Sequence, residues 1–247
     1  MTTPSQQTQP GWVVYDELAG PELVPARWAP EQLPLPEGGV RIPCDPNADV
    51  RVGDGQVRVK IPRFSLSHDK SQAADNVKYL MFSTERIELP AEGPAVFGVD
   101  LAVRNIGGDP ADVRAGLASL NVVDLDDSGC VFDICATEER VFALHERMVF
   151  GAKPGYEFSH LVESPFQPFG GRSGRALDCE IMLDRGRSLA VWQVDGRPIY
   201  RATGVRIPER VRVGFGVFTL VPIADGRSDS LRGQGLDATW RAFRYRI

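Results

Sequence analysis

Residues 177–200 contain two runs in which apolar and polar residues alternate, separated by a turn that contains glycine. In the first run, apolar residues at 177, 179, 181 and 183 alternate with Asp178, Glu180 and Met182. After the turn at 184–187, a second run leads into Asp195-Gly196. Side chains of a β-strand point alternately to its two faces, so a period of two on both sides of a turn predicts a β-hairpin. The Asp-Gly pair predicts that the chain then turns again.

The rest of the chain repeats this pattern of short runs and turns. Helical periodicity is nearly absent, and Gly, Pro and Asp separate the runs along all 247 residues. No repeat at the period of a solenoid or propeller is present. These features predict an all-β fold, an antiparallel β-sandwich that can form as one domain at this length. We expect that domain to span residues 12–247, after a mobile tail at 1–11 that is polar and rich in Pro and Gln.

The second hairpin turn carries the pattern W-x-V-D-G-x-x-x-Y, from Trp192 to Tyr200. This pattern resembles the WYVDG hairpin of concanavalin A-like jelly rolls, the fold of laminarinase-type glycosidases and legume-type lectins. Further motifs are similar to those of an uncharacterised actinobacterial family with a lectin-like sandwich, and they lie at residues 12–18, 122–134, 139–148 and 233–236. The resemblance implies a jelly-roll fold and supplies no reaction.

An arm of unusual composition follows the first expected strand, residues 12–18. Residues 19–49 contain seven prolines. Because proline lacks an amide donor and fixes φ, we expect an irregular arm, held on the sandwich by Leu23, Trp28 and Leu35.

The closing run, residues 238–247, is expected to pair with the first strand and so to close a sheet edge. In a regular strand, Trp240 and Phe243 of this run would face opposite sides of the sheet.

Charge and composition exclude several classes of partner. The net charge of −5 is scattered without a basic block, so no nucleic-acid partner is expected. No apolar run reaches membrane-spanning length and no signal-peptide pattern is present, so we expect no membrane association and a cytoplasmic location. In a reducing cytosol the four cysteines, which form no C-x-x-C pair, are expected to be free thiols: Cys44, Cys130, Cys135 and Cys179.

Glycoside hydrolysis is one function to consider, because the hairpin motif resembles that of laminarinase-type glycosidases. Retaining jelly-roll glycosidases carry a strand of the type E-x-D-x-E, which places two carboxylates about 5–5.5 Å apart on one face. The nearest strings here are Asp178, Glu180 and Asp184 in the hairpin, and Asp124 with Asp126 before a turn. Neither string has the position of a catalytic strand, so we interpret these carboxylates as solvent-facing.

Metal and cofactor motifs are also weak. Residues 124–129 fit the first half of a D-x-D-x-S-G calcium loop, but Cys135 stands where a bidentate Glu is needed, so a plain hairpin turn is favoured. No H-x-H or H-E-x-x-H spacing and no phosphate-binding glycine loop are present. The sequence therefore predicts neither a metal site nor a cofactor.

The candidate catalytic residues lie in and around two long connections, 62–78 and 154–174. A histidine can move protons near neutral pH, a carboxylate can serve as its partner, and a lysine can stabilise developing negative charge. These residue types give the catalytic set His145, His160, Glu146, Glu163 and Lys78, and neighbouring aromatic and polar groups give the substrate-binding set His68, Tyr79, Phe166, Phe169 and Trp192.

The working hypothesis is a small-molecule enzyme without a cofactor. It would be a cyclase, lyase or isomerase of secondary metabolism that acts by acid–base catalysis on a hydrophobic intermediate in a groove of the concave sheet. Two alternatives remain open: a non-catalytic, lectin-like carbohydrate-binding protein and a glycoside hydrolase. A structural module whose own side chains fill the groove is a further possibility.

Overall fold

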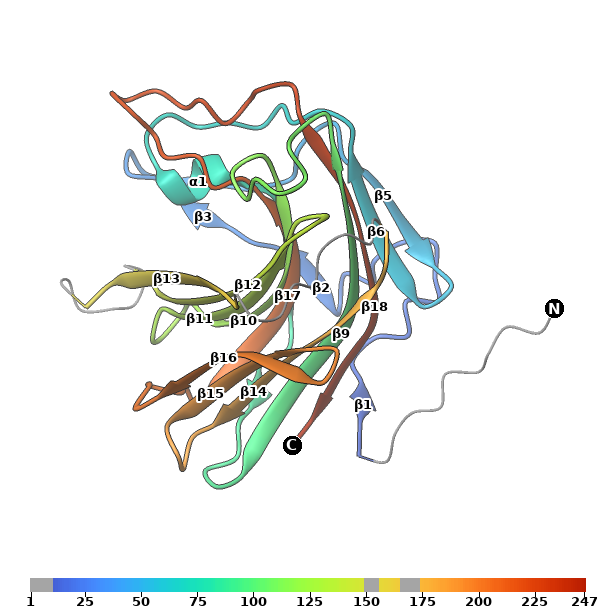
Figure 1. The fold of residues 1–247 in the computed structure, drawn as a ribbon, viewed down its shortest axis with the longest axis vertical. Coiled ribbons are helices and arrows are strands. Elements are labelled where there is room, and N and C mark those ends of the chain that lie inside the picture. The colour runs from blue at the N-terminus through green and yellow to red at the C-terminus, as the bar shows by residue number, and fades with distance from the viewer. Residues whose placement is uncertain (1–10, 149–155, 165–173) are drawn as a thin grey trace.

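The computed structural model describes residues 11–148, 156–164 and 174–247, and it contains two large antiparallel sheets that face each other (Figure 1). The expected tail at 1–11 lies, except for Gly11, outside the described residues. In the described part of the chain the only helix is the short α1 (Gln72–Asn76), within the connection 62–78. None of these residues belongs to a helix long and apolar enough to cross a membrane.

Among the described residues, sheet A and sheet B each contain eight strands, and the order of the strands gives the neighbours of each. Sheet A runs β16 (Arg197–Thr203), β15 (Leu189–Val194), β14 (Leu177–Asp184), β9 (Pro94–Ile106), β18 (Gly235–Arg246), β6 (Gln56–Ile61) and β5 (Asp49–Gly53), with β1 (Val13–Val14) also on β18. Sheet B runs β13 (Phe158–Glu163), β12 (Val141–Arg147), β11 (Cys130–Ala136), β10 (Leu117–Asp124), β17 (Arg210–Phe218), β7 (Val77–Ser83) and β2 (Trp28–Pro30), with β8 (Ile87–Glu88) also on β17. A small separate pair joins β3 (Leu33–Pro34) to β4 (Val40–Arg41).

The predicted hairpins are confirmed. Strand β14 pairs with β15 across the turn at 184–187, and β15 pairs with β16 across Asp195-Gly196. The apolar positions of β14 are buried in the core between the sheets, whereas Asp178 and Glu180 face outward and are only partly exposed. The alternation in sequence therefore reports which side of the sheet each residue occupies.

The closing strand also pairs with the first, as expected, with Val13 opposite Tyr245. The expectation that this strand alternates regularly, with Trp240 and Phe243 on opposite faces, is wrong. The register shifts between Arg241 and Arg244, where Ala242 has a φ of 53°, and this bulge changes the phase of the strand. As a result Trp240 and Phe243 both enter the same hydrophobic core.

The proline-rich arm is more regular than its composition indicates. It contributes β2 to the edge of sheet B, where Trp28 lies opposite Ser83. The Trp28 ring is buried against the rings of Tyr15, Phe215 and Phe243. Farther along, β3 and α1 pack on the side of sheet B that faces away from sheet A (Figure 1).

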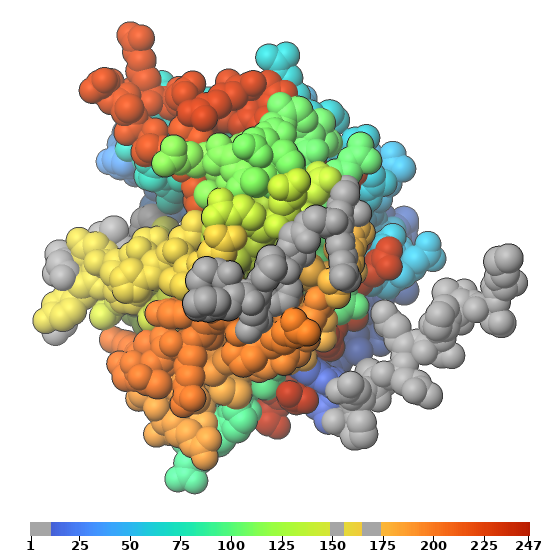
Figure 2. Space-filling model, in the orientation of Figure 1, coloured from blue at the N-terminus to red at the C-terminus, as the bar shows by residue number. Residues whose placement is uncertain are grey.

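The four cysteines are free, and three of them are buried. Figure 2 shows that β13, in yellow, and the hairpin β15–β16, in orange, reach the surface on the same side of the molecule. That side brings the outer strands of the two sheets together.

Candidate functional site

The register of sheet B assigns each candidate side chain to one of two faces. Phe132 lies opposite His145, and both belong to the face that looks toward sheet A. Val131 lies opposite Glu146 on the other face, which we call the outer face of sheet B. Neighbours along a strand point to opposite sides, so His145 and Glu146 cannot serve one site from the same face.

A chain of hydrogen-bonded polar groups lies on this outer face, in strands that are otherwise apolar. The Ser119 hydroxyl donates to Oδ1 of Asn121 over 2.9 Å, and Nδ2 of Asn121 donates to Oδ2 of Asp133 over 2.7 Å. All three side chains are buried, and Asp133 is only 4% exposed. Its other oxygen, Oδ1, is buried and has no hydrogen-bond partner in the described part of the chain.

Two carboxyl groups of the outer face have raised pKa values. Burial raises the pKa of Asp133 well above its usual range and the nearby Glu146 raises it further, against the hydrogen bond from Asn121. Burial also raises the pKa of Glu146, opposed by a hydrogen bond from Ser159. A carboxyl group held in its neutral form can donate a proton, and an unsatisfied buried oxygen costs free energy unless a ligand or function uses it. Such pairs are characteristic of functional sites.

Aromatic rings lie over β17, which is separated from β11 by β10, because two residues of β17 lack side chains. A Cβ atom on Gly214 would lie 2.3 Å from the Phe82 ring, and one on Gly216 would lie 2.4 Å from the Phe218 ring. Phe82 is buried, whereas Phe218 is partly exposed. Phe218 therefore offers a ring surface beside Ser119 on β10, which lies opposite Gly216.

The histidines predicted from the sequence lie together on the opposite face. His145 and His160 are register partners on β12 and β13, and their ring centroids are 6.4 Å apart. The His145 ring also stands 5.6 Å from that of Trp192 on sheet A, which is fully buried and has an indole nitrogen without a partner among the described residues. Burial, together with the charge of His160, lowers the pKa of His145 to about 4.

Lys78 lies far from both histidines in the chain and is fully buried. Its Nζ donates to the carbonyls of Leu66 and Asp75 and to the Ser230 hydroxyl, over 2.7, 2.5 and 2.9 Å. The ammonium group has three donors, and each of them has an acceptor. Lys78 therefore holds loops together, and its side chain does not reach the surface.

The other predicted residues are dispersed. Tyr79 is stacked on Phe215 in the core, with a ring-centroid distance of 6.3 Å, and His68 stands 3.4 Å from Glu37. Glu163, on the outer face, is bound to Arg140 at the exposed edge of sheet B. Phe166 and Phe169 lie outside the described residues. The structure thus brings His145, His160 and Trp192 together, and places Glu146, Glu163 and Lys78 elsewhere.

The residues 124–129 form the hairpin turn that the sequence favours. The Asp124 carboxylate accepts from the backbone N–H groups of Asp127 and Ser128. Within the described ranges, no group of three or more His, Cys, Asp or Glu side chains is arranged to hold a metal ion.

Asp133 and Asn121 were missed by the sequence reasoning. The available signal was a single carboxylate in the middle of the apolar run 130–136, where a charged residue has a desolvation cost that packing does not explain. The candidate carboxylates Asp178, Glu180 and Asp184 belong instead to β14 of sheet A, where Arg244 binds Asp178 over 2.5 Å. Their interpretation as solvent-facing is wrong for Asp184, and likewise for Asp124 in the β10–β11 turn, because both are buried.

Two facing antiparallel sheets in this strand order define a concanavalin A-like jelly roll, the fold of laminarinase- and lichenase-type glycoside hydrolases. An endo-1,3-β-glucanase from Streptomyces sioyaensis superimposes with a TM-score of 0.59 at 12% identity, over 99% of both chains. LamAcat from Zobellia galactanivorans gives 0.57 at 10% identity, over 94% of this chain and 96% of its own. A Bacillus licheniformis β-glucanase gives 0.52 at 14% identity, over 98% and 100%.

The chain belongs to a family of unknown function, DUF6081, whose model matches residues 23–247. Among curated proteins, none matches the sequence. The family and the fold agree with the resemblance found in the motifs, and the actinobacterial origin stays a prediction.

Proposed function

We propose that this protein is a carbohydrate-active enzyme that hydrolyses a glycosidic bond on the outer face of sheet B, with Asp133 as general acid and Glu146 as general base. One observation carries the proposal. Asp133 has a buried, unpartnered Oδ1 and lies diagonally across from Glu146, and both carboxyl groups have raised pKa values.

The chemistry follows from the protonation states. A neutral Asp133 would protonate the oxygen of the leaving sugar, and an ionised Glu146 would take a proton from the attacking water. Ser119 and Asn121 hold Asp133 in place, and the partly exposed Phe218 ring offers a stacking surface for a sugar.

The spacing favours inversion at the anomeric carbon. The Cα atoms of diagonal neighbours on adjacent antiparallel strands are roughly 7–8 Å apart, which is compatible with the separation of about 6.5–9.5 Å between the carboxyl groups of inverting enzymes. A retaining pair on β11 itself is not supported, because Val131 and Cys135 occupy the outward positions on either side of Asp133.

The substrate class is proposed from the fold. Two of the neighbours named above, from Streptomyces sioyaensis and Bacillus licheniformis, are glucanases, so β-linked glucans are the first substrates to test. The cyclase, lyase or isomerase hypothesis shares the acid–base chemistry, but it relied on His145, which faces sheet A, and on Lys78, whose buried ammonium group is already bound by three acceptors.

The test is an assay of laminarin and lichenan hydrolysis, in which the release of reducing ends is measured. Asp133→Asn and Glu146→Gln should each lower kcat at least about 100-fold, the usual contribution of a general acid or base. Glu180→Gln is the matched control, because Glu180 is also a partly buried glutamate with a raised pKa but lies on sheet A. Proton NMR of the first product should show inverted anomeric configuration. Equal turnover in wild type and both variants would contradict the proposal.

The burial of Asp133 favours a second candidate, a non-catalytic carbohydrate-binding protein. A carboxyl group only 4% exposed can donate one hydrogen bond to a sugar hydroxyl without reaching a scissile bond. Calorimetric binding of laminarin oligosaccharides without turnover, weakened in Asp133→Asn, would establish this function instead.

A further inference from the structure

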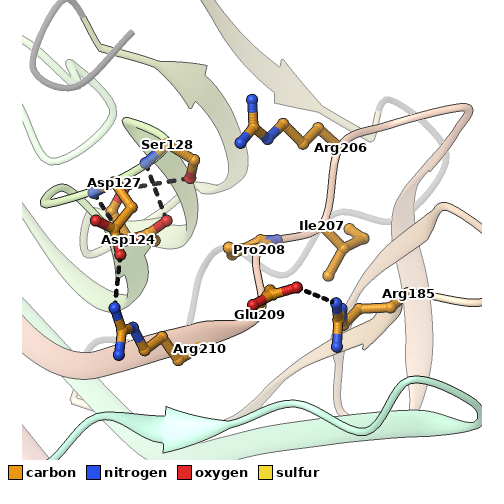
Figure 3. A pocket seen from close by; sticks show the side chains of 9 residues that line it. All are labelled: Asp124, Asp127, Ser128, Arg185, Arg206, Ile207, Pro208, Glu209 and Arg210. Atoms are coloured by element: carbon orange, nitrogen blue, oxygen red, sulfur yellow. Dashed lines mark hydrogen bonds and ion pairs between the residues drawn. The ribbon is translucent and has the colours of Figure 1, made fainter.

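A pocket lies where three loops of the two sheets meet, away from the outer face of sheet B. It has a volume of about 400 Å³, within the size range of small-molecule sites. Its walls come from the β10–β11 turn, the β14–β15 turn and the connection between β16 and β17, and the lining residues are Asp124, Asp127, Ser128, Arg185, Arg206, Ile207, Pro208, Glu209 and Arg210 (Figure 3).

Arg206 is the unpaired cation of this pocket. In the described part of the chain its guanidinium has neither a hydrogen bond nor an ion pair, and Figure 3 shows it on the same side as Ser128 with no interaction drawn to it. A guanidinium carries five donors in a planar fork that matches carboxylate and phosphate oxygens. Its donors are therefore available to a ligand.

The other two arginines are paired in a way that a ligand can replace. Arg185 binds Glu209 over 3.0 Å and Arg210 binds Asp127 over 3.1 Å. Each of these ion pairs uses one nitrogen, and the carboxylates of Glu209 and Asp127 are well exposed. A second nitrogen of Arg185, Nη1, donates to the Leu89 carbonyl over 3.2 Å and keeps the side chain anchored beside the pocket. Exposed pairs of this kind contribute little to stability, so exchange for a ligand's oxygens costs little.

The wall opposite is rigid. Both Asp124 oxygens accept backbone N–H groups of the turn, and the buried Ser128 hydroxyl accepts from the Cys130 amide. Buried Pro208 and half-buried Ile207 supply an apolar surface. The pocket thus combines a free guanidinium with a shaped, partly apolar wall.

We propose that this pocket binds a small organic oxyanion, a molecule bearing a carboxylate or a phosphate ester, with its anionic group on the Arg206 guanidinium. Arg185 and Arg210 then reorient from Glu209 and Asp127 toward the same group. The site is independent of Asp133 and Glu146, since it lies at the loops of the sandwich and shares no residue with the outer face.

Titration calorimetry with glucuronate and with glucose 6-phosphate, each compared with glucose, tests the proposal. We expect at least one of the two anions to bind and glucose not to bind at this site, and the anion with the greater affinity identifies the ligand class. Arg206→Gln should weaken binding at least about tenfold, because a charge-assisted bidentate contact is lost. Added salt should weaken binding as well.

Arg63→Gln is the matched control, since Arg63 is an exposed arginine outside the pocket, and it should bind like wild type. Arg206 is exposed, so Arg206→Gln should keep the wild-type melting temperature. Binding must also persist in Asp133→Asn, which separates this site from the glycoside site. Lack of binding of both anions, or equal affinity in Arg206→Gln and wild type, overturns the proposal.

Discussion

Asp133 and Glu146 lie diagonally across from each other on β11 and β12, because Glu146 is the register partner of Val131, two residues before Asp133. The two side chains therefore share the outer face of sheet B. Burial raises the pKa of both carboxyl groups, and the charge of Glu146 raises the pKa of Asp133 further. This relationship, which depends only on the register, places two carboxyl groups with raised pKa values on one face of an apolar sheet.

Asp133→Asn should change how stability depends on pH. The pKa of Asp133 is raised on folding, so its favourable contribution exists below the pKa of the unfolded chain and is lost as pH rises through the folded pKa. The variant should remove this loss and be more stable than wild type at pH 7, by about 1.4 kcal/mol per unit of pKa difference. Urea denaturation between pH 4 and pH 8 measures it, and parallel profiles for the two proteins would refute the prediction.

Gly216→Ala should destabilise the protein by about 1–3 kcal/mol, the usual cost of overpacking. The added Cβ would lie 2.4 Å from the Phe218 ring and 2.9 Å from the Tyr79 carbonyl oxygen, and the carbonyl belongs to a paired strand that cannot retreat. Gly20→Ala is the control, because its nearest neighbour is 3.6 Å away. Thermal and urea unfolding of both variants compare them; a similar stability of the two would contradict the packing argument.

The fold could be predicted from the sequence because alternation marks one buried face of each strand. The assignment of buried faces from alternation is correct at β14, where apolar and polar residues alternate regularly. The same assignment is wrong for Trp240 and Phe243, because a bulge between them changes the phase of the strand and the sequence pattern does not indicate it.

The candidate site was harder to predict because it depends on register. Residues 130–136 are buried on both faces, so they show no alternation, and the distance from Asp133 to Glu146 is set by pairing between strands. His145 and His160 were predicted because the chain has few histidines. They are indeed register partners, but they lie on the face opposite to Glu146. Lys78 was predicted from its charge, and its burial follows from two connections, around Leu66 and Asp75 and around Ser230, that the sequence does not bring together.

Lys78→Met should destabilise the protein by about 3–5 kcal/mol, because it leaves the fully buried Asp75 without its cation. The Lys78 Nζ lies 3.8 Å from Oδ1 of Asp75. Adding Asp75→Asn should recover part of the loss, since the neutral amide keeps an oxygen for the Ser228 and Ser230 hydroxyls. A double-mutant cycle in urea gives the coupling energy, and strict additivity would show that the pair does not interact.

His145→Phe should make the protein less sensitive to acid. The pKa of His145 is lowered to about 4, so its contribution to stability is complete above the unfolded pKa of about 6.5 and is lost as pH falls through 4. That difference corresponds to about 3 kcal/mol, and phenylalanine fits a site already formed by the rings of Phe132, Phe158 and Trp192. NMR titration of the wild-type imidazole supplies the direct measurement. A midpoint near 6.5 would refute the account, whereas a midpoint near 4 means that His145 is neutral at pH 7 and too weak a base to carry the proton transfer that the sequence assigned to it.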